Sequence, residues 1–329
     1  MIVYRLCDQN EVNNIFENMD VFTVGHKFQK DNTKNTHMYI QEKKYMHFFE
    51  QIIHLLYLNY SKGKIICIYS IPDEILKLSS GKGFYLDFIN FENIQEITEY
   101  AIESNKIKFN YLQKIYIIKE DLDFDYVPSE QEIYNHLYLI YDFKKNKSKI
   151  EKILTGNNVA ESICKNIELF LTLMPEIKYM FGFEHNHPHH HLDVWQHTLE
   201  VLNNLYVNDL ELNMAALLHD VGKPFSYQDK EVRNFHGHCE ISCEITKKIL
   251  TRLGYNKEFI QNVTYLVKTH DTIIEPNNLD NNYEMVRKRL KLQYADAKAH
   301  HPDKIQKRIK ILNNINDEFN LIKDKYKNI

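Results

Sequence analysis

Histidine and aspartate stand side by side at His219-Asp220, near the end of the segment LELNMAALLHDVGKP. The residues before this pair are apolar nearly all round, which is typical of a helix buried in a protein core. Burying two ionisable side chains is unfavourable unless they pair with each other or bind a metal ion. Because one such dipeptide can arise by chance, its interpretation depends on other candidate ligands in the chain.

Four further candidate ligands lie in separate segments that have helical spacing of apolar residues. They are His197 in WQHTL, His238 in FHGHCE, His270 in VKTHD and Asp296 in YADAK. Imidazole and carboxylate groups that converge from several helices suit a divalent ion, and helical bundles build such sites from facing helices. The pattern therefore predicts a metal site among these helices.

The order of these motifs, His197, then His219-Asp220, then Asp296, resembles the H…HD…D signature of the HD-domain superfamily of metal-dependent phosphohydrolases. The segments LDVWQHT, AALLHDVGKP, NFHGHCEIS and YADAKA are similar to the HD domains attached to bacterial tRNA nucleotidyltransferases. The resemblance covers residues 175–316 and implies an all-α helical bundle for this part of the chain.

The resemblance also implies roles for individual residues. It implies that a first divalent ion is bound by His197, His219, Asp220 and Asp296. It places His238 and His270 at positions that hold a second ion or contact the substrate phosphate, and the residues leave both roles open. Lys223 resembles a basic residue that neutralises phosphate, and its alternative is a cation at a helix C-terminus. The expected cofactor is one or two ions of Mn, Mg, Ni, Co or Fe.

A divalent ion lowers the pKa of a bound water and takes charge from phosphoryl oxygens in the transition state. Asp220 is expected to bind the ion and to orient or deprotonate the water, so Asp220 and Lys223 are the predicted catalytic residues. The predicted reaction is phosphoester hydrolysis on a nucleotide, a cyclic phosphate or an RNA end. Two alternatives stay open, a diiron oxygenase on the same scaffold and a nucleotide-binding regulatory module without turnover.

Several other conspicuous residues receive a structural interpretation. The histidine-rich segment 185–193 is predicted to be a solvated or substrate-edge loop, and His236 and the pair His300-His301 to be polar residues near helix ends. The basic run 287–291 is predicted to be a solvated helix face, with a shallow surface for an RNA end as the alternative.

Helices are expected throughout the second half of the chain. The predicted ranges are 158–174, 193–205, 210–224, 238–253, 257–270 and 283–300. Asp193, followed three residues later by Gln196, has the pattern of a capping box. The first half is predicted to be a small sheet with helices against it, with strands at 64–71, 84–91 and 114–120 and helices at 45–60 and 93–104. The predicted fold class is therefore α+β, with an α/β domain at 1–150 and an all-α HD domain at 151–329.

The function of residues 1–150 is the least defined part. This range holds glycine only at four separate positions, Gly25, Gly63, Gly81 and Gly83, so it has no Gly-Gly pair. A nucleotidyltransferase head needs such a pair, and the chain is therefore not expected to add nucleotides to tRNA. A faint resemblance to ADP-ribosyltransferase-like domains is one alternative, and a domain that packs on the HD module and shapes its pocket is favoured over it.

Composition narrows the class of protein. Hydrophobic residues make up 43% and charged residues 26% of the 329 positions, and 41 Lys+Arg against 45 Asp+Glu leave a net charge of −4. These values favour a globular protein and disfavour DNA binding by bulk charge, so no sequence-specific DNA binding is expected.

No signal peptide or membrane span is expected, and five scattered cysteines predict reduced thiols in the cytoplasm. Cys239 and Cys243 could share a helix face and are interpreted as small core residues. The sequence makes no prediction of the oligomeric state.

Overall fold

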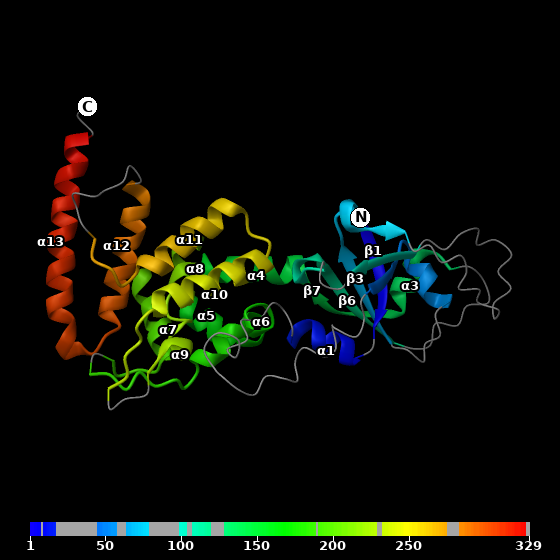
Figure 1. The fold of residues 1–329 in the computed structure, drawn as a ribbon, viewed down its shortest axis with the longest axis horizontal. Helices are drawn as coiled ribbons and strands as arrows, with labels where there is room; N and C mark the ends of the chain where they lie inside the picture. Colours follow the sequence, from blue (N-terminus) through cyan, green and yellow to red (C-terminus); the bar gives the residue numbers. More distant parts are fainter. Residues whose placement is uncertain are drawn as a thin grey trace. The chain divides into compact units, whose positions relative to one another are not determined.

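The computed structural model describes residues 1–7, 9–17, 45–57, 64–78, 99–103, 107–119, 128–188, 190–228, 232–274 and 283–326. Among these residues the chain forms two compact units that divide between Lys147 and Ser148. The first unit is built on a β-sheet and the second is helical (Figure 1), which confirms the predicted α+β class.

An antiparallel sheet forms the first unit, with the described strands in the order β4-β5-β2-β1-β3-β6-β7. These strands are β1 (Ile2–Cys7), β2 (Tyr45–Phe49), β3 (Ile65–Ser70), β4 (Lys77–Leu78), β5 (Glu99–Glu103), β6 (Leu112–Ile118) and β7 (Leu137–Asp142). The helical pieces around them are α1 (Gln9–Glu17), η1 (Ile52–Tyr57), η3 (Asp73–Ile75), η5 (Phe109–Tyr111) and α3 (Glu130–Asn135). β3 is buried at five successive positions, which explains its continuous run of apolar residues from Ile65 to Tyr69.

The predicted strands at 64–71 and 114–120 are confirmed by β3 and β6, and the predicted strand at 84–91 lies outside the described residues. The two predicted helices of this unit are wrong where the structure describes them. The segment 45–60 begins as β2 and continues as η1, and Glu99–Glu103 of the segment 93–104 forms β5. β2 pairs with both β1 and β5, so long-range backbone pairing overrides the local apolar spacing.

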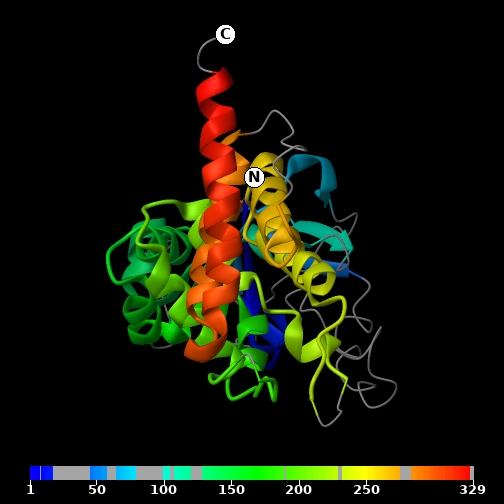
Figure 2. The same cartoon turned by 90° about the vertical axis from the view of Figure 1, so that its left-hand side faces the viewer.

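The second unit is a bundle of helices. Their bounds are α4 (Phe143–Leu154, which begins just before the division), α5 (Val159–Lys165), α6 (Ile167–Leu173), η6 (Pro175–Met180), α7 (Val194–Leu205), α8 (Leu210–Leu218), α9 (Lys223–Ser226), α10 (His238–Arg252), α11 (Lys257–Thr269), α12 (Tyr283–Lys298) and α13 (Pro302–Tyr326). Every residue of α8 from Leu212 to Leu218 is buried, as its uniformly apolar sequence predicts. α12 and α13 run side by side (Figures 1 and 2).

Four of the predicted helices agree with α7, α10, α11 and α12 to within two residues at each end. The predicted helix 158–174 is divided at Asn166 into α5 and α6, and the predicted helix 210–224 ends at Leu218 before α9 begins. Within the described part of the chain, no helix combines the length and the apolar character that crossing a membrane requires.

Candidate metal centre

The predicted ligands lie at or near the ends of helices that pack together. α8 contacts α7, α11 and α12, and α10 contacts α9 and α11. His219 caps the C-terminal end of α8, His270 caps that of α11, and His238 is the first residue of α10. The Asp193 side chain accepts a hydrogen bond of 2.7 Å from the backbone N–H of Gln196, so the predicted capping box sets the start of α7, the helix that carries His197.

Gly222 lets the backbone after Asp220 approach α10 closely. A Cβ atom at this position would lie 2.5 Å from the backbone N of Ser242 and 2.7 Å from the backbone O of His238. The Gly222 N–H also donates a hydrogen bond of 2.9 Å to the Ser242 hydroxyl. The absence of a side chain therefore brings the start of α10, with His238, against the turn that carries Asp220.

Four imidazole rings are oriented in the same way. Each Nδ1 faces a backbone carbonyl, at 3.3 Å for His197 and Ala299, 2.7 Å for His219 and Ala216, 2.9 Å for His238 and Phe235, and 2.7 Å for His270 and Val267. Because a carbonyl only accepts, each Nδ1 carries the proton and donates it. A ring held in this way turns its Nε2 toward the centre, which is the arrangement found in histidine ligands of metals.

The two oxygens of Asp220 face two different pairs of these rings. Oδ2 lies 3.1 Å from Nε2 of His219 and 3.7 Å from Nε2 of His197. Oδ1 lies 3.6 Å from Nε2 of both His238 and His270. We call the first pair with Asp220 and Asp296 the first cluster, and the second pair with Asp220 the second cluster.

Asp296 completes the first cluster from α12. Its Oδ1 lies 3.0 Å from Nε2 of His197 and 3.8 Å from Nε2 of His219. The donor atoms of His197, His219 and Asp220 lie within 4.8 Å of one another. All the predicted ligands thus lie in one place, with Asp220 shared between the two clusters.

Unsatisfied buried atoms show that these residues fit a cation. His219 Nε2 and Oδ1 of Asp220 are buried and have no hydrogen-bond partner within the described residues, whereas Oδ2 of Asp220 forms an ion pair of 2.7 Å with Lys223. Buried polar atoms are normally hydrogen-bonded, and exceptions mark functional sites or ion sites. Nitrogen and carboxylate donors in this number suit a divalent transition metal.

The charges of the carboxylates suit the same conclusion. Burial alone would raise the pKa of Asp220, but His219 and Lys223 hold that pKa well below its usual value. Burial acts in the same direction on Asp296, and His300 and His197 likewise keep its pKa well below the usual value. Both carboxyl groups are therefore ionised, so the centre offers anionic oxygen donors at neutral pH.

The imidazoles of the two clusters differ in their titration. Burial lowers the pKa of His219 in spite of Asp220. Burial would also lower the pKa of His270, but its interactions with Asp220 and Cys239 raise that pKa well above the usual value. The first cluster therefore holds a neutral ring, whereas His270 keeps a proton near Asp220 until another cation replaces it.

Lys223 lies inside the centre and not at the surface of a helix end. Its Nζ is 2.7 Å from Oδ2 of Asp220 and 3.1 Å from Nε2 of His185. His185 is 1% exposed, and its Nδ1 donates to the carbonyl of Leu192 at 2.8 Å, so its Nε2 accepts from the ammonium. A buried chain thus runs from the loop through His185 and Lys223 to Asp220.

The histidine-rich loop is only partly as predicted. His185 is not solvated, and its ring stacks on that of His190 with centroids 3.8 Å apart. His190 in turn contacts His300, whose Nε2 is 4.0 Å from Oδ1 of Asp296. His190 and His300 line the pocket, whereas His189 lies outside the described residues. The density of histidines drew attention to this region. The fold of the loop depends on the pairing of Glu184 with Asp193, which the spacing of the histidines does not predict.

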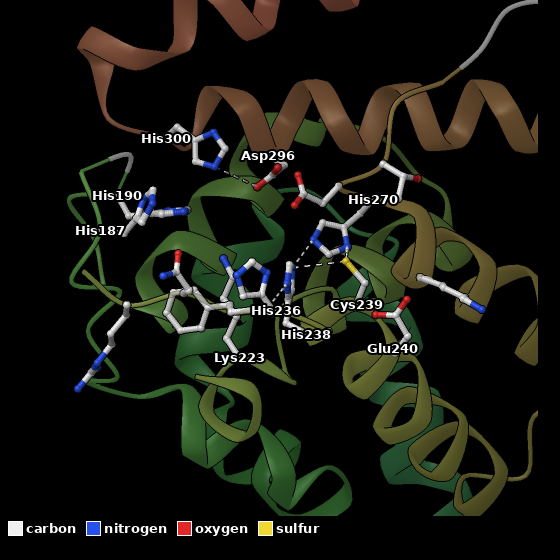
Figure 3. Close-up of a pocket in the computed structure, with 17 residues that line it drawn as sticks. His187, His190, Lys223, His236, His238, Cys239, Glu240, His270, Asp296 and His300 are labelled. Atoms are coloured by element: carbon white, nitrogen blue, oxygen red, sulfur yellow. Dashed lines mark hydrogen bonds and ion pairs between the residues drawn. The ribbon is translucent and has the colours of Figure 1, made fainter. Parts of the chain in front are cut away.

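The pocket itself has a volume of about 380 Å³. Figure 3 shows His238, Cys239 and His270 turned toward one another beneath Asp296 and His300. Its wall also includes the cations Lys223, Arg233 and Lys268.

Cys239 is half-buried in this wall, so its interpretation as a core residue is wrong. Burial would raise the pKa of its thiol, but the contacts with His238 and His270 outweigh burial and lower that pKa to about 7.

The basic run on α12 is largely structural. The Arg289 guanidinium donates to the carbonyls of Thr269, Thr272 and Ile273, which closes the end of α11. Lys288 Nζ lies 3.0 Å from Asp209 and 2.6 Å from Glu211. Two of the basic residues at 287–291 thus bind the protein itself, which argues against the run as a free surface for RNA.

Comparison with known proteins agrees with this geometry. The model of the HD domain family matches residues 189–314. An A-adding tRNA nucleotidyltransferase of Deinococcus radiodurans is 43% identical over 88 residues, which is 25% of this chain and 20% of that protein. A CC-adding tRNA nucleotidyltransferase of Thermus thermophilus is 33% identical over 133 residues, which is 38% of this chain and 30% of that protein. The matched part spans less than a third of either relative. Residues 189–314 of this chain are therefore an HD domain, of the metal-dependent phosphohydrolase superfamily and related in sequence to tRNA nucleotidyltransferases.

Proposed function

We propose that the HD domain hydrolyses a phosphoester bond in a nucleotide, a cyclic phosphate or an RNA end. The observation that carries this proposal is the position of Asp220, whose two oxygens each face a pair of buried Nε2 atoms. His197, His219, Asp220 and Asp296 would hold one divalent ion, and His238 and His270 would hold a second ion beside Asp220. When bound, a divalent ion supplies a nucleophilic water at neutral pH and stabilises the charge of phosphoryl oxygens.

The chain's own residues would bind and orient the substrate. Lys223 and the neighbouring cations of the pocket wall, Arg233 and Lys268, give it a positive character that suits a phosphate. Asp220 lies between the two clusters and is ionised, so it can accept a proton or orient a water at its free lone pairs. Lys223 keeps this carboxylate charged and faces the same pocket, so we assign it to neutralising the substrate phosphate.

A nucleotide or RNA end is the favoured substrate because both relatives act, by their names, on tRNA. The adding reaction itself is not carried over, since residues 1–150 have no Gly-Gly pair. We assign residues 151–329 to the HD hydrolase and residues 1–150 to a separate α/β domain.

The test is a hydrolysis screen of the purified full chain with Mn²⁺, Mg²⁺, Ni²⁺, Co²⁺ or Fe²⁺. The substrates are phosphomonoesters, 2′,3′-cyclic nucleotides, cyclic dinucleotides, nucleoside triphosphates and short RNAs with phosphorylated ends. We expect metal-dependent hydrolysis of at least one class, and a loss of at least about 10³-fold in the double variant His219→Ala/Asp220→Ala.

Asp303→Asn is the matched control, because this carboxylate is 83% exposed on α13 and its ion pair among the described residues is with His301, which belongs to neither cluster. It should keep its activity within about twofold, as expected of an exposed substitution away from the site. Full activity in the double variant would contradict the proposal. Two bound irons with oxygen consumption and no hydrolysis would also overturn it, in favour of an oxygenase, and tight nucleotide binding without product would overturn it in favour of a regulatory module.

A further inference from the structure

Cys239 lies beside the second cluster, where the proposed reaction gives it no role. It follows His238 on the first turn of α10, and its Sγ is 3.5 Å from Nε2 of His238. The same sulfur is 3.8 Å from Nδ1 of His270. Donor atoms of these three residues lie within 4.8 Å of one another, and all three line the pocket (Figure 3).

The two rings of this cluster face each other in a way that calls for a cation. Nε2 of His238 and Nε2 of His270 are 3.3 Å apart, and the Nδ1 atom of each ring already donates to a backbone carbonyl. Two lone pairs at this distance repel unless a proton or a metal ion lies beside them. Oδ1 of Asp220, a residue only 1% exposed, lies 3.6 Å from both nitrogens and has no hydrogen bond.

Two of the donor separations match those of a tetrahedral zinc site, one between two nitrogens and one between nitrogen and sulfur. Zinc bonds of about 2.0–2.1 Å to nitrogen and about 2.3 Å to sulfur give donor separations of about 3.3 Å between two nitrogens and about 3.5 Å between nitrogen and sulfur. The structure has 3.3 Å between the two Nε2 atoms and 3.5 Å between His238 Nε2 and Cys239 Sγ. The carboxylate oxygen is a few tenths of an ångström too distant and would complete the tetrahedron by a small rotation.

We propose that Cys239 is a thiolate ligand of a second metal site, together with His238, His270 and Oδ1 of Asp220. Ion binding would replace the thiol proton, which passes to solvent, and it would form one bond from the ion to sulfur. A thiolate favours zinc, cobalt or iron over magnesium and manganese, whereas the first cluster offers only nitrogen and oxygen. The two sites of the centre would therefore prefer different ions. The inference shares the metal centre of the proposed function, and its test is separable from it.

Cobalt absorption reports the sulfur bond directly. The full chain, stripped of metal with a chelator, is titrated with Co²⁺ while the near-ultraviolet thiolate-to-cobalt charge-transfer band is recorded. We expect the band in the wild type and in Cys243→Ser, and its loss in Cys239→Ser. Cys243 is the matched control, because it lies one turn further along α10, is also half-buried, and does not line the pocket. No band in the wild type, or the same band in Cys239→Ser, would overturn the proposal.

Zinc provides a second readout that does not depend on folding of the Cys239 variant. In Cys243→Ser, bound zinc should shield one additional thiol from a thiol-specific reagent, and manganese at the same concentration should not. In Cys239→Ser, the affinity for the second zinc should fall at least about tenfold. Equal reactivity with and without zinc would contradict the thiolate ligand. A cobalt band without hydrolysis of any substrate would overturn the proposed function alone, and hydrolysis without a band would overturn the thiolate ligand alone.

Discussion

The helical unit buries charge in two regions that differ in how the charges are satisfied. At the C-terminal end of α10, Arg252 donates to both carboxylate oxygens of Glu176 at 2.7 and 2.8 Å and to the carbonyl of Leu173. At the N-terminal end of the same helix, His238 faces Oδ1 of Asp220, which has no hydrogen-bond partner within the described residues. One helix therefore joins a paired region to an unsatisfied one.

The difference separates groups that hold the fold from groups that serve the site. This bidentate pair satisfies both carboxylate oxygens of Glu176 and gives the guanidinium a counter-charge, so it fixes the position of α10. His219 Nε2 and Oδ1 of Asp220 have no hydrogen-bond partner within the described residues, which is unfavourable in an apolar core unless a ligand compensates. Burial of ionisable groups alone would not have distinguished the two regions.

Breaking the paired region should have the largest effect on stability. Glu176→Gln removes the carboxylate that pairs with the buried Arg252, and we expect the free energy of unfolding to fall by about 3–5 kcal/mol. Urea unfolding at pH 7 measures this change. Manganese affinity of the folded variant should stay near that of the wild type, since neither residue faces the clusters. A loss below about 1 kcal/mol would show that the pair does not hold α10.

Binding of a metal ion at the unsatisfied region should stabilise the protein by a comparable amount. Mn²⁺ at about 1,000 times its dissociation constant is expected to raise the free energy of unfolding of the wild type by about 4 kcal/mol. Asp220→Asn removes the shared carboxylate and should lose most of this gain, whereas Glu176→Gln should keep it. Thermal unfolding with and without a chelator checks the expectation. An equal gain in the free energy of unfolding in the wild type and in Asp220→Asn would show that the ion binds at another site.

A pH series without metal sharpens the comparison further. Burial and the charge of Lys223 lower the pKa of His185 to about 2, while an unfolded histidine titrates near 6.5. Below pH 6.5 the unfolded chain binds a proton that the folded chain does not. The free energy of unfolding therefore falls with falling pH, by about 1.4 kcal/mol for each pH unit from this group alone. His185→Gln should show a shallower fall between pH 6.5 and 5, and parallel curves would contradict the assignment.

The sequence predicted more of the site than of the sheet, for a physical reason. His197, His219, Asp220 and Asp296 were found because each lies in a local motif on a helix, and helical spacing is visible in short segments. β2 and β5 were predicted as helices because their pairing is long-range, and no local pattern encodes it. The contacts of His185 and Cys239 arise from a loop and a helix start that the fold brings to the pocket, so spacing gave no sign of them.

The smallest effect is expected at an ion pair that is neither buried nor part of the site. Lys288 Nζ lies 2.6 Å from Glu211 and 3.0 Å from Asp209, and its side chain is 22% exposed. Partly exposed pairs typically contribute about 1 kcal/mol or less, because water already solvates both charges. Lys288→Met should therefore lower the free energy of unfolding by no more than about 1 kcal/mol in urea, and less in high salt. The affinity for a short RNA should be unchanged, because this ammonium is already bound by two carboxylates. A marked loss of RNA binding would instead indicate that the basic run 287–291 is a surface for the substrate.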